Sequence, residues 1–224
     1  MNFVKQLEKA FAENSHPQQA LDMAQYMRNQ FVFLGIRTPL RRQLLKEILV
    51  INKQEIRENC REIAQILFLK EEREFHYCAI DILMKELKNN FTKDDIVLIN
   101  NLITTKSWWD SVDLIAKYLL GGYLEIYPEE INACVKQFSE SESLWLIRSS
   151  ILFQLGYKQK TDFELLQTIC LQHQQSQEFF IQKAIGWALR EYAKTNPNAV
   201  IEFVKSHNLQ PLSKKEALKN LVIA

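Results

Sequence analysis

Two tryptophans and two aspartates lie within one short stretch of the sequence, residues 106–113. In a helix, Trp109 and Asp113 are four residues apart and share one face, which then presents an indole ring beside a carboxylate. Indole faces attract cations, and a nearby carboxylate stabilises positive charge that develops in a transition state. The pair therefore suits cleavage of a glycosidic bond, in which the sugar becomes cationic. A single carboxylate can suffice when the leaving base is already positively charged through alkylation of a ring nitrogen.

Charged residues recur at a spacing of thirty-five residues, at Asp113, Arg148 and Lys183. Each lies within an apolar helical run, and Trp187 follows Lys183 by four residues on the same helical face. The recurrence predicts that the three charged residues occupy equivalent positions of successive helices. They would form a polar row flanked by Trp109 and Trp187. The alternative is that both tryptophans are core residues and that the charges are ordinary solvated flank residues.

Low glycine and proline content, 5 residues of each among 224, predicts long helices with few turns. No pair of segments alternates in the manner of paired strands. Apolar spacing and helix-start signals predict helices at these residues: 2–13, 17–31, 38–49, 53–69, 72–89, 94–105, 108–121, 128–139, 142–156, 162–173, 178–195, 197–206 and 213–222. The pair Gly121-Gly122 is expected to end one helix. Capping boxes are expected at two helix starts: Thr161-x-x-Glu164 and Ser213-x-x-Glu216.

This succession of helices, joined by short loops, predicts an all-α fold. Together with the thirty-five-residue recurrence it favours an α-solenoid of antiparallel helical pairs, with one domain over residues 1–224. A single helical pair cannot bury its apolar face alone, so neighbouring pairs stack into a continuous core. The inner helices of such a stack line a concave face, where the polar row would lie.

Composition excludes several classes of protein. The formal net charge is +1 and 47% of the residues are hydrophobic, which fits a globular core but gives no argument for nucleic-acid binding from net charge alone. No apolar run is long enough for a membrane span, and the N-terminal segment is an amphipathic helix rather than a signal peptide. The four cysteines and four histidines are scattered. We therefore expect free thiols in a reducing cytoplasm, no metal site and no cofactor.

Basic residues elsewhere could follow a DNA backbone. Thr38 is predicted to be the N-cap of a helix whose first residue is Pro39. Arg37, Arg41 and Arg42 surround this helix N-terminus, which favours phosphate. Other basic residues lie near the ends of later helices, where a concave rim would let them track a duplex: Lys106, Lys158, Lys160, Arg190, Lys194, Lys214 and Lys215. The alternative for each is an ordinary solvated side chain. Three aromatic residues fit either the core or an apolar edge against DNA: Phe179, Phe180 and Tyr26.

Four stretches carry the motifs of one known family: residues 26–39, 105–113, 151–155 and 179–197. Together they span nearly the whole chain, and Trp-Trp-Asp and Phe-Phe-Ile-Gln-Lys-Ala-Ile-Gly-Trp are their most specific motifs. In these motifs the sequence resembles the AlkD family of bacterial DNA alkylation-repair glycosylases. The resemblance implies a HEAT-like helical-repeat fold. It also implies hydrolysis of the N-glycosidic bonds of cationic N3- and N7-alkylated purines in duplex DNA, without flipping of the lesion into a base pocket.

The resemblance also implies roles for individual residues. Asp113 would be the catalytic carboxylate, which stabilises the sugar cation and positions the water. Trp109 and Trp187 would pack against the deoxyribose of the lesion, and Arg148 would hold the adjacent phosphate. Six residues match the family's DNA-contacting surface: Tyr26, Thr38, Arg42, Phe179, Phe180 and Arg190. The expected DNA-binding surface also includes five further basic residues: Arg37, Arg41, Lys106, Lys158 and Lys183.

Two positions depart from the pattern of close relatives. Gly156 stands where a lysine is expected, which removes a possible phosphate contact, and Arg37 stands where a glutamine is expected, which adds charge. The leading hypothesis is a monomeric, monofunctional DNA glycosylase of base excision repair in the bacterial cytoplasm. Two alternatives stay open. One is a non-catalytic helical-repeat module that binds distorted or branched DNA, and the other is a scaffold that binds proteins.

Overall fold

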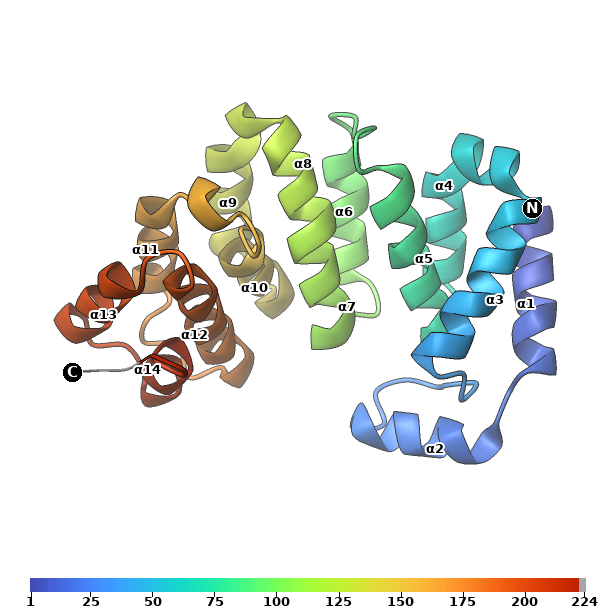
Figure 1. Cartoon of the computed structure of the whole chain (residues 1–224), viewed down its shortest axis with the longest axis horizontal. Coiled ribbons are helices and arrows are strands. Elements are labelled where there is room, and N and C mark those ends of the chain that lie inside the picture. Colours follow the sequence, from blue (N-terminus) through green and yellow to red (C-terminus); the bar gives the residue numbers. More distant parts are fainter. Residues whose placement is uncertain (222–224) are drawn as a thin grey trace. The chain divides into compact units, whose positions relative to one another are not determined.

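The computed structural model describes residues 1–221 and divides the chain into two compact units, Met1–Thr92 and Lys93–Ala224. Apart from one isolated parallel bridge between Val32 and Glu72, the regular elements of the described residues are helices. The expectation of an all-α chain of packed helices is therefore confirmed (Figure 1). The assignment of a single domain to residues 1–224 stays a prediction. No helix within the described part of the chain combines the length and the apolar character that crossing a bilayer requires.

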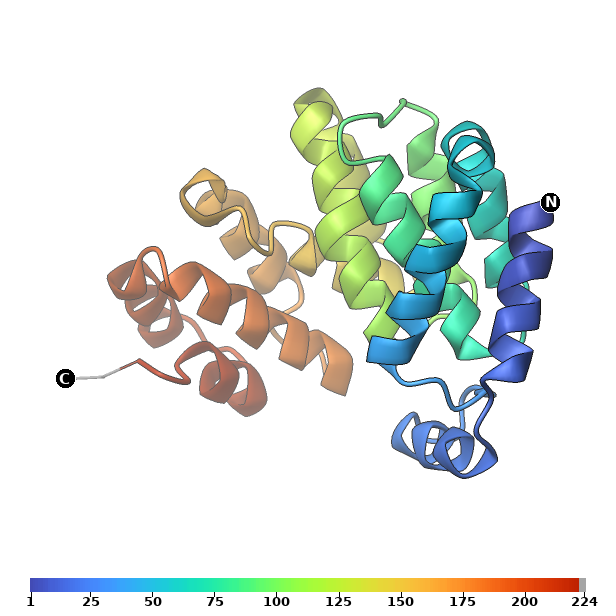
Figure 2. The same cartoon turned by 45° about the vertical axis from the view of Figure 1, so that its right-hand side comes forward.

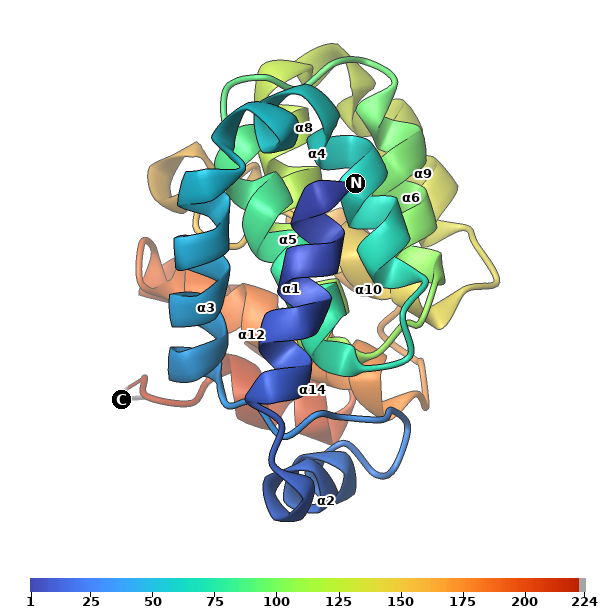
Figure 3. The same ribbon diagram turned by 90° about the vertical axis from the view of Figure 1, so that its right-hand side faces the viewer.

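The first unit contains five α-helices: α1 (Asn2–Glu13), α2 (Pro17–Tyr26), α3 (Thr38–Ile51), α4 (Lys53–Phe68) and α5 (Arg73–Glu86). Phe3, Leu7 and Phe11 of α1 are fully buried and recur at helical spacing, so one apolar stripe explains its packing against α3 and α4. Figure 3 shows α1 beside these two helices. α4 packs along α5, whereas no residue of α2 is buried.

The segment between α2 and α3 is anchored by Glu74 of α5. Its carboxylate accepts hydrogen bonds from the backbone N–H groups of three successive residues, at 2.9–3.1 Å: Leu34, Gly35 and Ile36. Gly35 has a φ of 84°, and a Cβ atom there would lie 2.2 Å from the carbonyl oxygen of His16. Glycine is required here for both reasons. The anchored segment leads directly into the start of α3.

Two helix boundaries in this unit differ from those expected. α2 ends at Tyr26 rather than at residue 31, because Arg28 and Asn29 adopt a φ of 56°, which a helix does not tolerate. α3 includes Thr38, and Arg37 occupies the N-cap position that the sequence assigned to Thr38. Both differences arise at loop residues, whose backbone angles the apolar spacing of the neighbouring helices does not determine.

The second unit contains the remaining elements: α6 (Asp95–Thr104), α7 (Trp109–Leu114), the π-helical segment η1 (Ile115–Leu120), α8 (Gly121–Ile126), the 3-10 turn η2 (Pro128–Glu130), α9 (Ile131–Ser139), α10 (Leu144–Leu152), the 3-10 turn η3 (Lys158–Lys160), α11 (Phe163–Gln172), α12 (Phe179–Ala193), α13 (Pro197–Ser206) and α14 (Pro211–Ala217). α10 lies at the centre, in contact with α7, η1, α9 and α12. α12 also packs against α13 and, most extensively, against α14.

The glycine pair at 121–122 does not end a helix. α7, η1 and α8 follow one another without a break and form a single rod, coloured yellow-green in Figures 1 and 2. Gly121 has helical angles, φ −59° and ψ −47°, and a Cβ atom there would lie 2.4 Å from the carbonyl oxygen of Phe153. The hydroxyl of Tyr157 donates a hydrogen bond to the Gly121 carbonyl at 2.6 Å. Gly121 is therefore needed for close packing between helices. The neighbouring residues in the sequence do not reveal whether a glycine allows such packing or ends a helix.

Both predicted capping boxes are wrong. Asp162 caps α11 by accepting a hydrogen bond from the N–H of Leu165 at 2.9 Å, so the cap lies one residue after Thr161. Ser213 lies inside α14, and its hydroxyl donates to the carbonyl of Gln182 on α12 at 3.0 Å. A serine three residues before a glutamate is therefore not sufficient to identify a helix start, because the hydroxyl can serve a tertiary contact instead.

The substitution Gly121→Ala tests the close approach of α8 to Phe153. The added methyl group has no room, so we expect a loss of about 1–3 kcal/mol of unfolding free energy from overpacking. Gly122→Ala is the matched control at the next helical position, which is half-exposed. Alanine is the better helix former there, so the control should be neutral or stabilising. Thermal unfolding measures both variants, and equal melting temperatures for the two would contradict the packing argument.

Candidate functional site

Asp113 of α7 and Arg148 of α10 form a two-point ion pair. The Nε atom of Arg148 donates to Oδ1 of Asp113 at 2.7 Å, and NH2 donates to Oδ2 at 2.9 Å. The two side chains are only 13% and 5% exposed. NH1 of Arg148 donates to the carbonyl of Phe180 in the first turn of α12. One guanidinium therefore joins three helices of the second unit and fixes the plane of the carboxylate.

Burial is the main influence on the ionisation of Asp113. Loss of solvent raises the pKa of Asp113 above its ordinary value, and the hydrogen bonds and charge of Arg148 lower it. The negative charge of Asp110, three residues earlier, raises the same pKa. A raised pKa on a carboxylate that keeps a small exposed fraction is a feature of functional carboxylates, and structural ion pairs share it.

An aromatic cluster borders this ion pair. The rings of Trp108, Trp145 and Phe180 lie with their centroids 5.1–5.7 Å apart, and Phe179 extends the cluster at 5.3 Å from Phe180. The guanidinium carbon of Arg148 lies 5.9 Å from the centre of the Phe180 ring. The aromatic surroundings explain how water is kept from most of the ion pair.

Sequence reasoning missed Trp108 and Trp145. The thirty-five-residue recurrence carried a signal for Trp145, because Asp110, Trp145 and Phe180 share that spacing. Each lies three residues before a member of the charged series, on a neighbouring position of the same helical face. For Trp108 we find no comparable signal, since it lies at the N-cap of α7 with extended backbone angles.

The two tryptophans singled out from the sequence both keep exposed surface. Trp109 is the first residue of α7, one helical turn before Asp113, and is partly exposed. Trp187 is partly exposed on α12 and lines a cavity of about 500 Å³ together with Arg190 and Lys194. Neither is a fully buried core residue, so both keep surface for a ligand.

Lys183 and Arg190 share one acidic partner, Glu216 of α14. The Nζ atom of Lys183 lies 2.8 Å from Oε1 of Glu216, and NH1 of Arg190 lies 2.6 Å from Oε2. The hydrogen bond from Lys183 and then that from Arg190 lower the pKa of Glu216, against the opposing effect of burial. The three charged residues of the recurrence thus lie on neighbouring helices, α7, α10 and α12; Asp113 and Arg148 pair directly, and Lys183 belongs to a separate ion pair.

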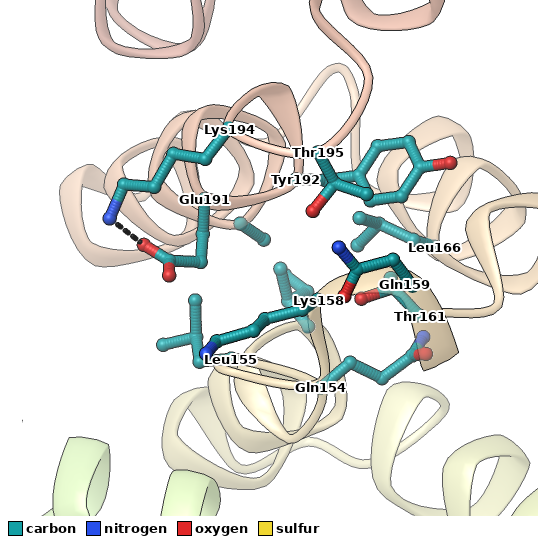
Figure 4. Close-up of a pocket in the computed structure, with 12 residues that line it drawn as sticks. Gln154, Leu155, Lys158, Gln159, Thr161, Leu166, Glu191, Tyr192, Lys194 and Thr195 are labelled. Carbon is teal, nitrogen blue, oxygen red and sulfur yellow. Dashed lines mark hydrogen bonds and ion pairs between the residues drawn. The ribbon is translucent and has the colours of Figure 1, made fainter.

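Three other predicted DNA contacts of the second unit are exposed. Lys106 and Lys158 are exposed and have positive φ angles, 49° and 56°. Lys158 and the Glu191–Lys194 ion pair border the same cavity of about 230 Å³ between η3 and the end of α12 (Figure 4). The side chain of Phe179, at the start of α12, is 51% exposed. All three side chains therefore keep exposed surface.

The structure contradicts two of the expected phosphate contacts. Arg41 is only 4% exposed, and its NH1 atom lies 3.0 Å from Oδ2 of Asp81, so it is a buried structural residue of the first unit. Arg148 is also 4% exposed and is committed to Asp113 and to a backbone carbonyl. Neither guanidinium can reach a phosphate in this arrangement, because both are enclosed by protein.

The other candidates of the first unit lie on its surface, and these are four residues: Tyr26, which is 72% exposed, Arg37, Thr38 and Arg42. All lie at the end of α2, at the start of α3 or immediately before it. Within residues 1–221, no group of three or more His, Cys, Asp or Glu side chains is arranged to hold a metal ion. The four cysteines are buried and unpaired as disulfides.

Comparison with known proteins identifies the relatives of the chain. The sequence profile of the family described as DNA alkylation repair enzyme matches residues 7–221. A predicted DNA alkylation repair enzyme from Enterococcus faecalis is 36% identical over 94% of this chain and 98% of its own, with a TM-score of 0.85. The structure of smu.31 from Streptococcus mutans is 14% identical over 81% of this chain and 98% of its own, with a TM-score of 0.58. The structure of AlkD2 from Streptococcus mutans is 15% identical over 80% of this chain and 89% of its own, with a TM-score of 0.59. At this low identity, the two structures show only that their fold is shared with this chain. No curated protein sequence matches the chain.

The substitution Arg148→Gln tests how far the ion pair supports the second unit. It leaves the nearly buried carboxylate of Asp113 unpaired, so we expect a loss of about 3–5 kcal/mol of unfolding free energy at neutral pH. The double variant Asp113→Asn, Arg148→Gln removes both charges and should recover most of that loss. Urea unfolding measures all three proteins.

The loss of unfolding free energy in Arg148→Gln should also depend on pH, in a direction that follows from the pKa of Asp113. Without the lowering influence of Arg148, the pKa of Asp113 should rise further above its unfolded value of 3.8. A group whose pKa is raised on folding stabilises the protein at low pH, and that stability is lost as pH rises through the folded-state pKa. The deficit of Arg148→Gln relative to wild type should therefore grow as pH rises from about 4. A loss of unfolding free energy that stays constant with pH would contradict the expected rise in the pKa of Asp113.

Proposed function

The chain belongs to the DNA alkylation repair enzyme family, and on that premise we propose that it is a DNA glycosylase acting on cationic N3- or N7-alkylated purines in duplex DNA. The reaction would be hydrolysis of the N-glycosidic bond without flipping of the lesion into a base pocket. The single observation that carries the proposal is the carboxylate of Asp113, mostly buried, held in one orientation by Arg148 and one helical turn from Trp109.

The chemistry requires little from the protein beyond electrostatics. An alkylated purine with a positively charged ring is a good leaving group, so no acid is needed to protonate it. As the bond between the sugar carbon and the purine nitrogen breaks, its electron pair neutralises the purine, and positive charge develops on the deoxyribose. Asp113 would stabilise that charge in surroundings that exclude most water. A water molecule oriented by the same carboxylate would attack the sugar and lose a proton, which leaves an abasic site.

Arg148 would act as a positioning residue. Its two hydrogen bonds hold the plane of the Asp113 carboxylate, and its charge favours the ionised form against the effect of burial. This replaces the phosphate contact expected from the sequence. The partly exposed rings of Trp109 and Trp187 would flank the deoxyribose, where an indole face stabilises a cation.

The proposed DNA contacts of each unit are the predicted residues that keep exposed polar or aromatic groups: Tyr26, Arg37, Thr38 and Arg42 in the first unit, and Lys106, Lys158 and Phe179 in the second. Phe180, Lys183 and Arg190 of α12 add to the contacts of the second unit with smaller exposed fractions. The proposal includes action as a monomer in base excision repair in the bacterial cytoplasm. Salt-dependent affinity for duplex DNA is the property expected of such contacts.

One observation favours a second candidate function. Both carboxylate oxygens of Asp113 accept hydrogen bonds from Arg148, and the pair is almost enclosed, as a purely structural ion pair would be. A helical-repeat module that binds distorted or branched DNA without chemistry would have this arrangement. It would bind such DNA tightly and leave no abasic product.

The substitution Asp113→Asn separates the two functions. If Asp113 stabilises the sugar cation, release of 7-methylguanine from methylated duplex DNA should fall by about 10²–10³-fold, the typical effect of losing one electrostatic stabiliser. Affinity for the same DNA should change little, because Asp113 is mostly buried. Asp110→Asn is the matched control, since it neutralises the other carboxylate of the same helix, and it should retain release within a few-fold. Equal rates for wild type and Asp113→Asn, or no release by wild type, would reject the glycosylase assignment.

A further inference from the structure

The cavity of about 500 Å³ beside Trp187 has a composition that suits an anion. Two of its cationic side chains lie three and seven residues after Trp187: Arg190 in α12 and Lys194 at the C-cap of that helix. A third, Lys219, follows α14. The acid Glu191 lines the cavity as well. The spacing on α12 places the indole and both cations on one helical face. An aromatic plate and three cations therefore line one cavity of the second unit.

The charges around the cavity do not cancel. Lys194 pairs with Glu191 at 2.6 Å, and Arg190 shares Glu216 with Lys183. Together with Lys219, the cations in and beside the cavity number four and the acids two, which leaves a surplus of two positive charges. Among residues 1–221, no acid forms an ion pair with Lys219, which is exposed. A surplus of this kind, next to an aromatic ring and open to solvent, attracts a phosphate group.

Glu216 orients Arg190 toward this cavity. Both hydrogen bonds from Arg190 to Glu216 use NH1, one to the carboxylate and one to the backbone carbonyl at 3.4 Å. The Nε and NH2 groups remain for a ligand. α14 can approach α12 this closely only because residue 186 is glycine: a Cβ atom there would lie 2.4 Å from the Cβ of Glu216. The position of Arg190 is therefore determined before any ligand arrives.

A tight turn holds Lys219 in place after α14. The N–H of Leu221 donates to the carbonyl of Leu218 at 3.0 Å, and Asn220 has a φ of 75°. Positive φ at the third residue is the requirement of a type II turn, which asparagine tolerates better than most residues. Lys219 is the second residue of this turn and lines the cavity.

We propose that this cavity is a phosphate subsite, in which Arg190, Lys194 and Lys219 bind a backbone phosphodiester of duplex DNA close to the nucleotide that Trp187 contacts. The inference rests on the proposed function, since it takes duplex DNA as the ligand. It makes Lys219 a DNA-contacting residue, gives Lys194, already a candidate from the sequence, a defined place, and gives Glu216 a positioning role. A backbone phosphate carries one negative charge and lies next to a deoxyribose, which matches cations placed beside an indole.

The experiment measures the salt dependence of binding to an undamaged duplex by fluorescence anisotropy. The slope of log affinity against log salt concentration is negative, and each phosphate that is no longer neutralised lowers its magnitude by about 0.9. We expect Lys219→Gln to lower the magnitude of the slope by part of that amount, and the double variant Lys194→Gln, Lys219→Gln to lower it further, toward the about 0.9 that one phosphate contributes. Lys205→Gln, on the exposed surface of α13 and outside the cavity, removes the same charge and should leave the slope unchanged.

Two outcomes would overturn the inference. One is an unchanged slope in both cavity variants. The other is binding of inorganic phosphate alone, abolished by Lys219→Gln without any change in DNA binding, which would identify a site for free phosphate. Because the duplex is undamaged, this assay does not depend on base release. Failure of the glycosylase proposal would appear in the release assay with Asp113→Asn, and failure of the subsite would appear only here.

Discussion

The second unit depends on one electrostatic constraint: a carboxylate that is nearly removed from water must remain paired. Asp113 and Arg148 satisfy each other at two points across α7 and α10, and the third contact of the guanidinium ties α12 to both. Taking two charges out of water is unfavourable, so a pair of this kind persists only where geometry is good and every remaining N–H has a partner. A purely apolar contact would hold the three helices at least as well. Stability alone therefore does not require charges at this place, and the proposed glycosylase chemistry would give the oriented carboxylate a use.

The backbone around Asp113 is shaped to hold that orientation. The π-helical segment η1 begins two residues after Asp113, and such segments occur frequently at functional sites because they shift the register of the side chains that follow. The rod continues without a turn through Gly121, whose lack of a side chain lets the Phe153 carbonyl approach directly. The hydrogen bond from Tyr157 to the Gly121 carbonyl links the same rod to the residues after α10. Asp113 and Arg148 thus lie on two elements that are fastened to each other at a second place, so their relative position does not depend on the ion pair alone.

Much of this organisation could be predicted from the sequence, and the parts that could not share a physical cause. Helical spacing of apolar residues located α1 within its observed bounds, and the thirty-five-residue recurrence placed Asp113 and Arg148 on neighbouring helices, where they meet. The family resemblance seen in the motifs is confirmed by the family match over residues 7–221. Arg41 was misjudged, and the acid shared by Lys183 and Arg190 was not foreseen, because these acidic partners lie 26 to 40 residues away, which spacing along one helix cannot reveal. Gly121 and Ser213 were misjudged for the same reason: their role is set by an atom of another helix.

The distribution of charge follows from these pairings. A net charge of +1 gives no argument for DNA binding, but net charge matters less than where the exposed cations lie. Acids lie against the buried guanidinium groups of Arg41 and Arg148, so those two arginines contribute structure and almost no external field. Arg37, Lys106 and Lys158 have exposed side chains, and the cavity beside Trp187 keeps a surplus of cations. Because acids neutralise the interior guanidinium groups while other basic side chains stay exposed, positive potential is concentrated where a phosphate can reach it. A chain that is nearly neutral as a whole can then still bind a polyanion, with an affinity that falls steeply as salt rises.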